Sequence, residues 1–148
     1  MAHYKTYLTG ALLAAAVAIT GCSSMMPASN SATLTGTLSG ANEVPPATSA
    51  GTGSIEAVLN KDTNVLTWKV TYSGLSGPVR AAHFHGPAAA NANAGVVVPF
   101  TGDLMSPMEG KATLTPAQAA DLLAGKWYVN LHTAANPGGE IRAQLVVR

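Results

Sequence analysis

The sequence predicts an all-β fold, an antiparallel Greek-key β-sandwich or barrel with one short helix. Most segments alternate apolar and polar residues, as in NVLTWKVTY at residues 64–72, which is the pattern of strands with one buried face. Clusters of Gly, Pro, Asn and Ser separate these segments, as turns do between short strands. Many short strands with turn residues between them are typical of sandwiches and barrels.

The same alternation marks four further segments, at residues 33–38, 53–60, 126–133 and 139–147. In each segment the apolar side chains share one face, which we expect to lie against the core. Trp68 and Trp127 both stand on such faces. We therefore predict that the two tryptophans are core residues on facing strands.

One short helix is expected in the segment TLTPAQAADLLAGK, which begins at residue 113. Thr115 is placed as the N-cap, with Pro116 at the first helical position and Gln118 at the third, and this combination is a capping box. The glycine after DLLA is placed to end the helix. Leu122 and Leu123 are expected to hold it against the sheet.

The first residues predict export and lipid anchoring. Residues 1–21 contain an apolar run that is too short for a membrane span and fits a secretory signal peptide. Cys22, the single cysteine of the chain, follows Ile-Thr-Gly as in a bacterial lipobox, so acyl chains on Cys22 are expected to hold the protein on a membrane. Residues 22–31 then form a flexible tether and residues 32–148 the domain. In a Gram-negative cell, Ser23 in place of Asp favours the outer membrane of the cell envelope, facing the periplasm. The alternative to a lipid anchor is an ordinary cleaved secretory peptide.

Composition excludes several classes of function. The chain has eight Lys and Arg against seven Asp and Glu, and they are scattered. Nucleic acid is therefore not expected as a partner, because phosphate binding needs clustered cations. No nucleophile elbow, phosphate-binding loop or dinucleotide fingerprint is present. The sequence therefore does not favour an enzyme.

Three histidines form the candidate site. His83 and His85 are one residue apart in AAHFHGPA, and His132 follows in KWYVNLHT. By alternation all three point away from the core, and an H-x-H pair on a strand can bind one metal ion. We predict a site for one copper ion, with zinc less favoured, and expect metal affinity to fall below about pH 6.5. The alternative is a hydrogen-bond network beneath the long irregular segment 86–110.

Further residues are expected near these imidazoles. If the last two strands form a hairpin, Asn130, Glu140 and Arg142 lie close to His132, and Glu140 or Asn130 orients an imidazole in the second shell. The alternative is an exposed polar face with an ordinary ion pair. Met105 and Met108, in DLMSPMEG, are thioethers of the kind that bind Cu(I), or they fill gaps in a loop.

Four blocks in order resemble the CHRD domain, named from chordin: SGANEVPP, AAHFHGPA, LLAGKWYVNLHT and NPGGEIRAQL. The likeness covers residues 32–147 and implies an all-β extracellular domain, but little about activity. In chordin the domains belong to a protein that binds growth factors, and that role is not transferred here.

A weaker resemblance is to copper/zinc superoxide dismutase, another Greek-key sandwich with an H-x-H on one strand and a distant histidine on another. It implies at most one mononuclear copper site at His83, His85 and His132, because no histidine remains to bridge a second metal. Three functions stay open: a copper-holding binding module, a metal-free structural module with a protein partner, and a copper enzyme acting on superoxide.

Overall fold

The computed structural model describes residues 1, 3 and 30–148 of the chain. The anchor Cys22 and nearly all of the predicted signal peptide and tether lie outside these residues. The elements are β1 (Ser31–Ser39), η1 (Gly40–Asn42), β2 (Thr52–Asn60), β3 (Val65–Ser73), β4 (Val79–His85), β5 (Val96–Pro99), β6 (Met108–Thr113), α1 (Pro116–Leu123), β7 (Tyr128–Thr133), β8 (Ile141–Gln144) and β9 (Val146–Val147).

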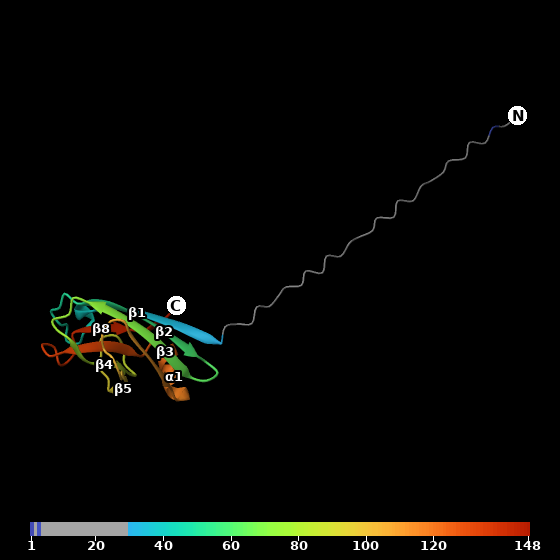
Figure 1. Cartoon of the computed structure of the whole chain (residues 1–148). Helices are drawn as coiled ribbons and strands as arrows, with labels where there is room; N and C mark the ends of the chain where they lie inside the picture. The colour runs from blue at the N-terminus through green and yellow to red at the C-terminus, as the bar shows by residue number, and fades with distance from the viewer. Residues whose placement is uncertain (2, 4–29) are drawn as a thin grey trace.

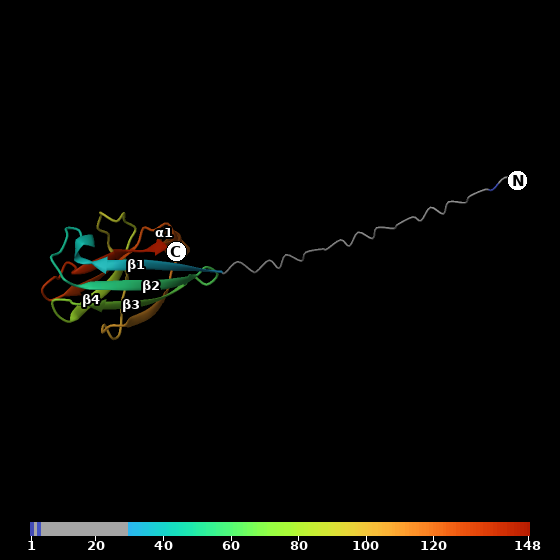
Figure 2. The ribbon, with the colours of Figure 1, turned by 90° about the horizontal axis from the view of Figure 1, so that it is seen from above.

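The strands form one antiparallel sheet that curls into a nearly closed barrel (Figures 1 and 2). Their order is β5-β4-β7-β8-β1-β2-β3-β6, and β9 pairs with β1. Hairpins join β1 to β2 and β2 to β3, whereas β3 and β4 are far apart in the sheet. For residues 30–148, this confirms the predicted antiparallel all-β fold of the barrel type with one short α-helix. No helix in residues 30–148 is long and apolar enough to cross a membrane.

The core lies inside the curled sheet and contains both tryptophans, as predicted. Trp68 on β3 is 7% exposed, and Trp127, which directly precedes β7, is 1% exposed. Both rings contact Phe84, with centroid distances of 5.0 Å for Trp68 and 6.0 Å for Trp127. Gly110 is opposite Trp68 in β6, where a Cβ would lie 2.4 Å from the indole ring. Glycine is therefore needed there for the strand to pass over the ring.

Helix α1 has the predicted start. The Thr115 side chain accepts a hydrogen bond from the Gln118 amide, and the Gln118 side chain accepts one from the Thr115 amide. After the helix, Gly125 adopts a φ of +70° and reverses the chain. Leu122 is buried, but Leu123 is 36% exposed, so only the first of the two leucines packs against the sheet as predicted.

The segment 86–110 is more regular than predicted. It contains β5 and the start of β6, both of which pair with longer strands. Met108 is the first residue of β6 and is 1% exposed inside the core, so the prediction that it is a thioether in a loop is wrong. Met105 is exposed and lines a hollow of about 630 Å³ beside Tyr72 and Leu75.

Candidate metal centre

Strands β4 and β7 place the three histidines on one face of the sheet. They are antiparallel neighbours in which His83 pairs with Asn130, His85 with Tyr128 and Ala81 with His132. The alternate residues of β4, Ala82 and Phe84, are buried in the core. The histidines therefore point outward, as the alternation predicts.

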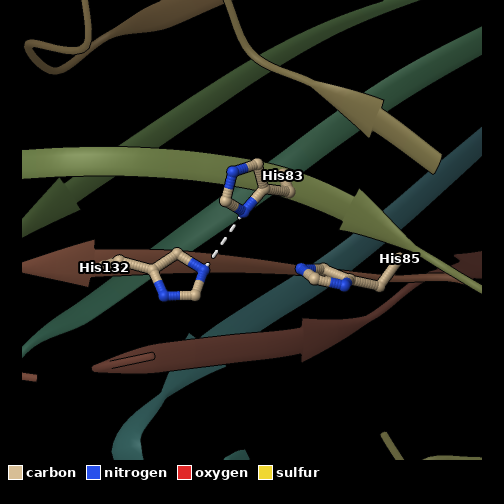
Figure 3. Close-up of side chains that lie close together, drawn as sticks. All are labelled: His83, His85 and His132. Atoms are coloured by element: carbon tan, nitrogen blue, oxygen red, sulfur yellow. Dashed lines mark hydrogen bonds between the residues drawn. The ribbon is translucent and has the colours of Figure 1, made fainter. Parts of the chain in front are cut away.

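The three imidazoles converge. One ring nitrogen of each histidine lies within 4.8 Å of the corresponding atoms of the other two. His83 Nδ1 and His132 Nε2 are 3.2 Å apart. Figure 3 shows that each ring turns one nitrogen toward a shared space between the strands. The prediction that two strands would bring these residues together agrees with this geometry.

Backbone carbonyls determine which nitrogen of two rings carries hydrogen. His132 Nδ1 is 3.0 Å from the Pro137 carbonyl oxygen, and His85 Nδ1 is 3.0 Å from that of Ala94. Because a carbonyl only accepts, each Nδ1 must be the N–H donor. In the neutral ring, Nε2 then has a free lone pair. His85 Nε2 is buried and has no hydrogen-bond partner within the described part of the chain.

The surroundings favour neutral imidazoles. Burial lowers the pKa of His83 below its usual 6.5, and repulsion from His132 and His85 lowers it further. Burial also lowers the pKa of His132, although the hydrogen bond to Pro137 opposes this. Both rings should therefore become protonated, and so unable to bind a metal, only at a more acidic pH than the 6.5 expected from the sequence.

A family model described as CHRD domain matches residues 34–145. The chain belongs to the CHRD family. The match includes most of β1, all of β2 to β8, and the three histidines of the site. No curated protein and no solved structure matches the chain.

Asn130 lies inside the histidine cluster of the CHRD domain, and it is 4% exposed. Its Oδ1 is 3.0 Å from His132 Nε2. This is the contact that the sequence predicted for a residue that orients an imidazole. The contact is also unusual. Because His132 Nδ1 carries the hydrogen that faces Pro137, His132 Nε2 has none, and the amide oxygen of Asn130 has no hydrogen to donate to it.

Arg142 lies one layer away from the imidazoles. The His85 ring stacks on Tyr128 at 4.7 Å, and the Arg142 guanidinium carbon lies 3.4 Å from the centre of the Tyr128 ring. The guanidinium also donates hydrogen bonds to the Asn93 side chain and the Ala92 carbonyl. Arg142 therefore fastens the loop 86–95 above the site and supports His85 through Tyr128.

Glu140 is placed elsewhere. Its carboxylate accepts hydrogen bonds from the hydroxyls of Ser49, Ser76 and Thr133 and from the Ser76 amide. Burial raises its pKa, but these hydrogen bonds together lower it to about 2. Glu140 thus ties the loops of Ser49 and Ser76 to the end of β7, and it does not orient an imidazole as the sequence suggested.

Glu43 is a residue of the site that the sequence analysis did not select. It is 6% exposed, and its Oε1 and the Asn130 Nδ2 both lie against Gly139. Burial raises the pKa of Glu43 to about 7, although the charge of Arg142 and the Asn130 side chain act in the opposite direction. The sequence signal that could have pointed to Glu43 is that it is the single acidic residue in the block SGANEVPP. The pattern alone did not link it to Asn130 on β7, which is distant in sequence.

Proposed function

We propose that this CHRD domain is a binding module that holds one Cu(II) ion through His83, His85 and His132. The observation that carries the proposal is the convergence of one nitrogen from each of three imidazoles within 4.8 Å. Three imidazole nitrogens from two strands are a ligand set that suits copper or zinc. Copper is preferred because it binds such sites more tightly than the other divalent first-row metals.

A metal-free hydrogen-bond network explains the arrangement less well. In the neutral cluster, His83 Nδ1–H can donate to the lone pair of His132 Nε2 at 3.2 Å, but Asn130 Oδ1 also faces that nitrogen at 3.0 Å and finds no hydrogen there. His85 Nε2 is buried without a partner, and an unsatisfied buried polar atom costs about 1–3 kcal/mol. A cation in the shared space would satisfy these atoms together. The lowered pKa values of His83 and His132 favour a metal ion over a proton.

Copper titration tests the proposal. The purified domain, stripped with a chelator, is expected to bind one Cu(II) ion per chain in titration calorimetry. His85→Ala and His132→Ala should each raise the Kd by more than about 100-fold, since loss of an outer-shell partner alone costs about 10–100-fold. Zn(II) should bind at the same site more weakly.

Met105→Ala is the control variant, because Met105 is exposed and its thioether favours Cu(I) rather than Cu(II). It should leave the Cu(II) affinity unchanged. A stoichiometry near zero in the wild-type protein, or equal affinity in the histidine variants, would leave the metal-free interaction module as the function.

We further propose that the domain is attached to the cell envelope through lipid on Cys22. The support is the sequence pattern of residues 1–22. Cys22→Ala, expressed with its own leader, is expected to leave the membrane fraction, whereas Ser23→Ala should remain there. If wild type and Cys22→Ala partition equally into the membrane fraction, the proposal of a lipid anchor on Cys22 is wrong.

A further inference from the structure

We infer that Asn130 Oδ1 is a fourth ligand, so that the protein itself completes a closed three-nitrogen, one-oxygen metal site. This inference rests on the proposed copper function, and deepens it, because it determines whether the bound ion has a position free for a substrate. Catalytic metal sites keep such a position open, whereas sites that only hold a metal fill it with protein ligands.

The strand register places Asn130 at the centre of the cluster. Asn130 is the direct cross-strand partner of His83 and stands two residues before His132 on the same face of β7. Side chains in such positions lie within contact distance of each other. His85 pairs with Tyr128 on the next outward-facing row. No rearrangement of the backbone is needed to bring the amide to the metal.

Contacts around the amide determine which of its atoms faces the histidines. The Asn130 side chain acts to lower the pKa of the Glu43 carboxyl, which an amide N–H facing the carboxyl does and an amide oxygen does not. Asn130 Nδ2 and Glu43 Oε1 both lie against Gly139, where a Cβ would be 2.7 and 2.4 Å from them. Gly139 has a φ of +128°, which favours glycine, and its missing side chain leaves room for this pair. Asn130 Oδ1 therefore faces His132.

Two distances within the cluster, both at His132 Nε2, are those of atoms that share one ion. Ligands 2.0–2.1 Å from a tetrahedral metal lie roughly 3.3 Å from one another. His132 Nε2 is 3.2 Å from His83 Nδ1 and 3.0 Å from Asn130 Oδ1. Asn130 Oδ1 can only accept a hydrogen bond, and it finds no hydrogen on His132 Nε2, whose lone pair also faces His83 Nδ1. A metal ion shared by these three atoms would turn both contacts into coordination bonds.

Azide binding to the copper-loaded protein is the test, because azide needs a vacant position and gives a charge-transfer band on Cu(II). In Asn130→Leu, the new side chain has nearly the same shape as that of asparagine but no atom that can bind a metal. We expect it to bind azide at least ten times more tightly than the wild-type protein does, and to raise the Kd for Cu(II) at least about tenfold. Asn130→Asp retains an oxygen and should keep azide out.

Asn91→Leu is the matched control, since Asn91 is exposed on the loop above the site. It should bind copper and azide as the wild type does. Circular dichroism and thermal melts check that each variant is folded. If Asn130→Leu fails to fold, the azide affinity of the wild-type protein is compared instead with two references. These are Asn130→Asp and small Cu(II) complexes of three imidazoles.

The outcomes separate the two proposals. In one outcome, the wild-type protein binds copper and also binds azide as tightly as Asn130→Leu or a three-imidazole complex does. That result overturns the proposal that Asn130 is a fourth ligand, and it leaves the copper function standing. Wild-type protein that binds no copper overturns both. Low azide affinity in the wild type, with high affinity in Asn130→Leu, establishes the closed site.

Discussion

Replacing Trp127 with alanine is expected to lower the free energy of unfolding by about 3–5 kcal/mol, the range for large-to-small changes of buried aromatic residues. Trp127 is 1% exposed and its ring lies 6.0 Å from that of Phe84. It also packs on Gly86, where a Cβ would be 2.6 Å from the indole ring. The loss is a large part of the stability of an ordinary domain, and urea denaturation measures it.

Leu123→Ala is the control for this experiment, because Leu123 is 36% exposed on the helix. Surface changes of this kind usually alter stability by less than about 0.5 kcal/mol. The native tryptophan emission should be blue-shifted, as is typical of buried indole rings. Red-shifted emission, or a Trp127→Ala variant as stable as Leu123→Ala, would show that the core is packed differently.

The second large effect is expected at Glu140. Its pKa is about 2 in the folded protein and 4.5 in the unfolded chain, so the unfolded state binds more protons between these values. Each unit of pKa difference corresponds to 1.36 kcal/mol. The carboxylate should therefore contribute on the order of 3 kcal/mol of stability above pH 4.5, and this contribution should be lost as the pH falls from 4.5 toward 2.

Unfolding curves measured between pH 7 and pH 2 check this prediction. Glu140→Gln removes the ionisable group, so its stability should be lower than wild type at pH 7 and should approach it at acidic pH. Glu56→Gln, at an exposed position on β2, serves as the matched control and should follow the wild-type pH profile. Parallel curves for wild type and Glu140→Gln would contradict the assigned role of the carboxylate.

A closed metal site would also explain why the domain resembles a binding module more than an enzyme. Four protein ligands on two paired strands would hold an ion in a rigid frame. The loop 86–95 is fastened above them by Arg142 and by the Tyr128 hydroxyl, which bonds the Ala94 backbone. Such an arrangement favours retention of the metal over exchange with a substrate.

Short-range chemistry made much of the fold predictable. The alternation in residues 64–72 places Trp68 and Val70 inside a sheet wherever that strand pairs, because successive side chains point to opposite faces. The start of the helix depends only on Thr115, Pro116 and Gln118, which contact each other within one turn. For the same reason, H-x-H on a strand must place His83 and His85 on one face.

Whatever depends on contacts between distant segments was decided by the tertiary structure. Met108 belongs to the core because β6 pairs with β3, and no local pattern separates that strand from a loop. Glu140 is drawn to Ser49 and Ser76, hydroxyls on loops that are distant in sequence. The sequence by itself determined which residues share a face, since that follows from backbone geometry. Only the curled sheet decided that Glu43 would meet Asn130, because that contact depends on how strands far apart in the chain pack together.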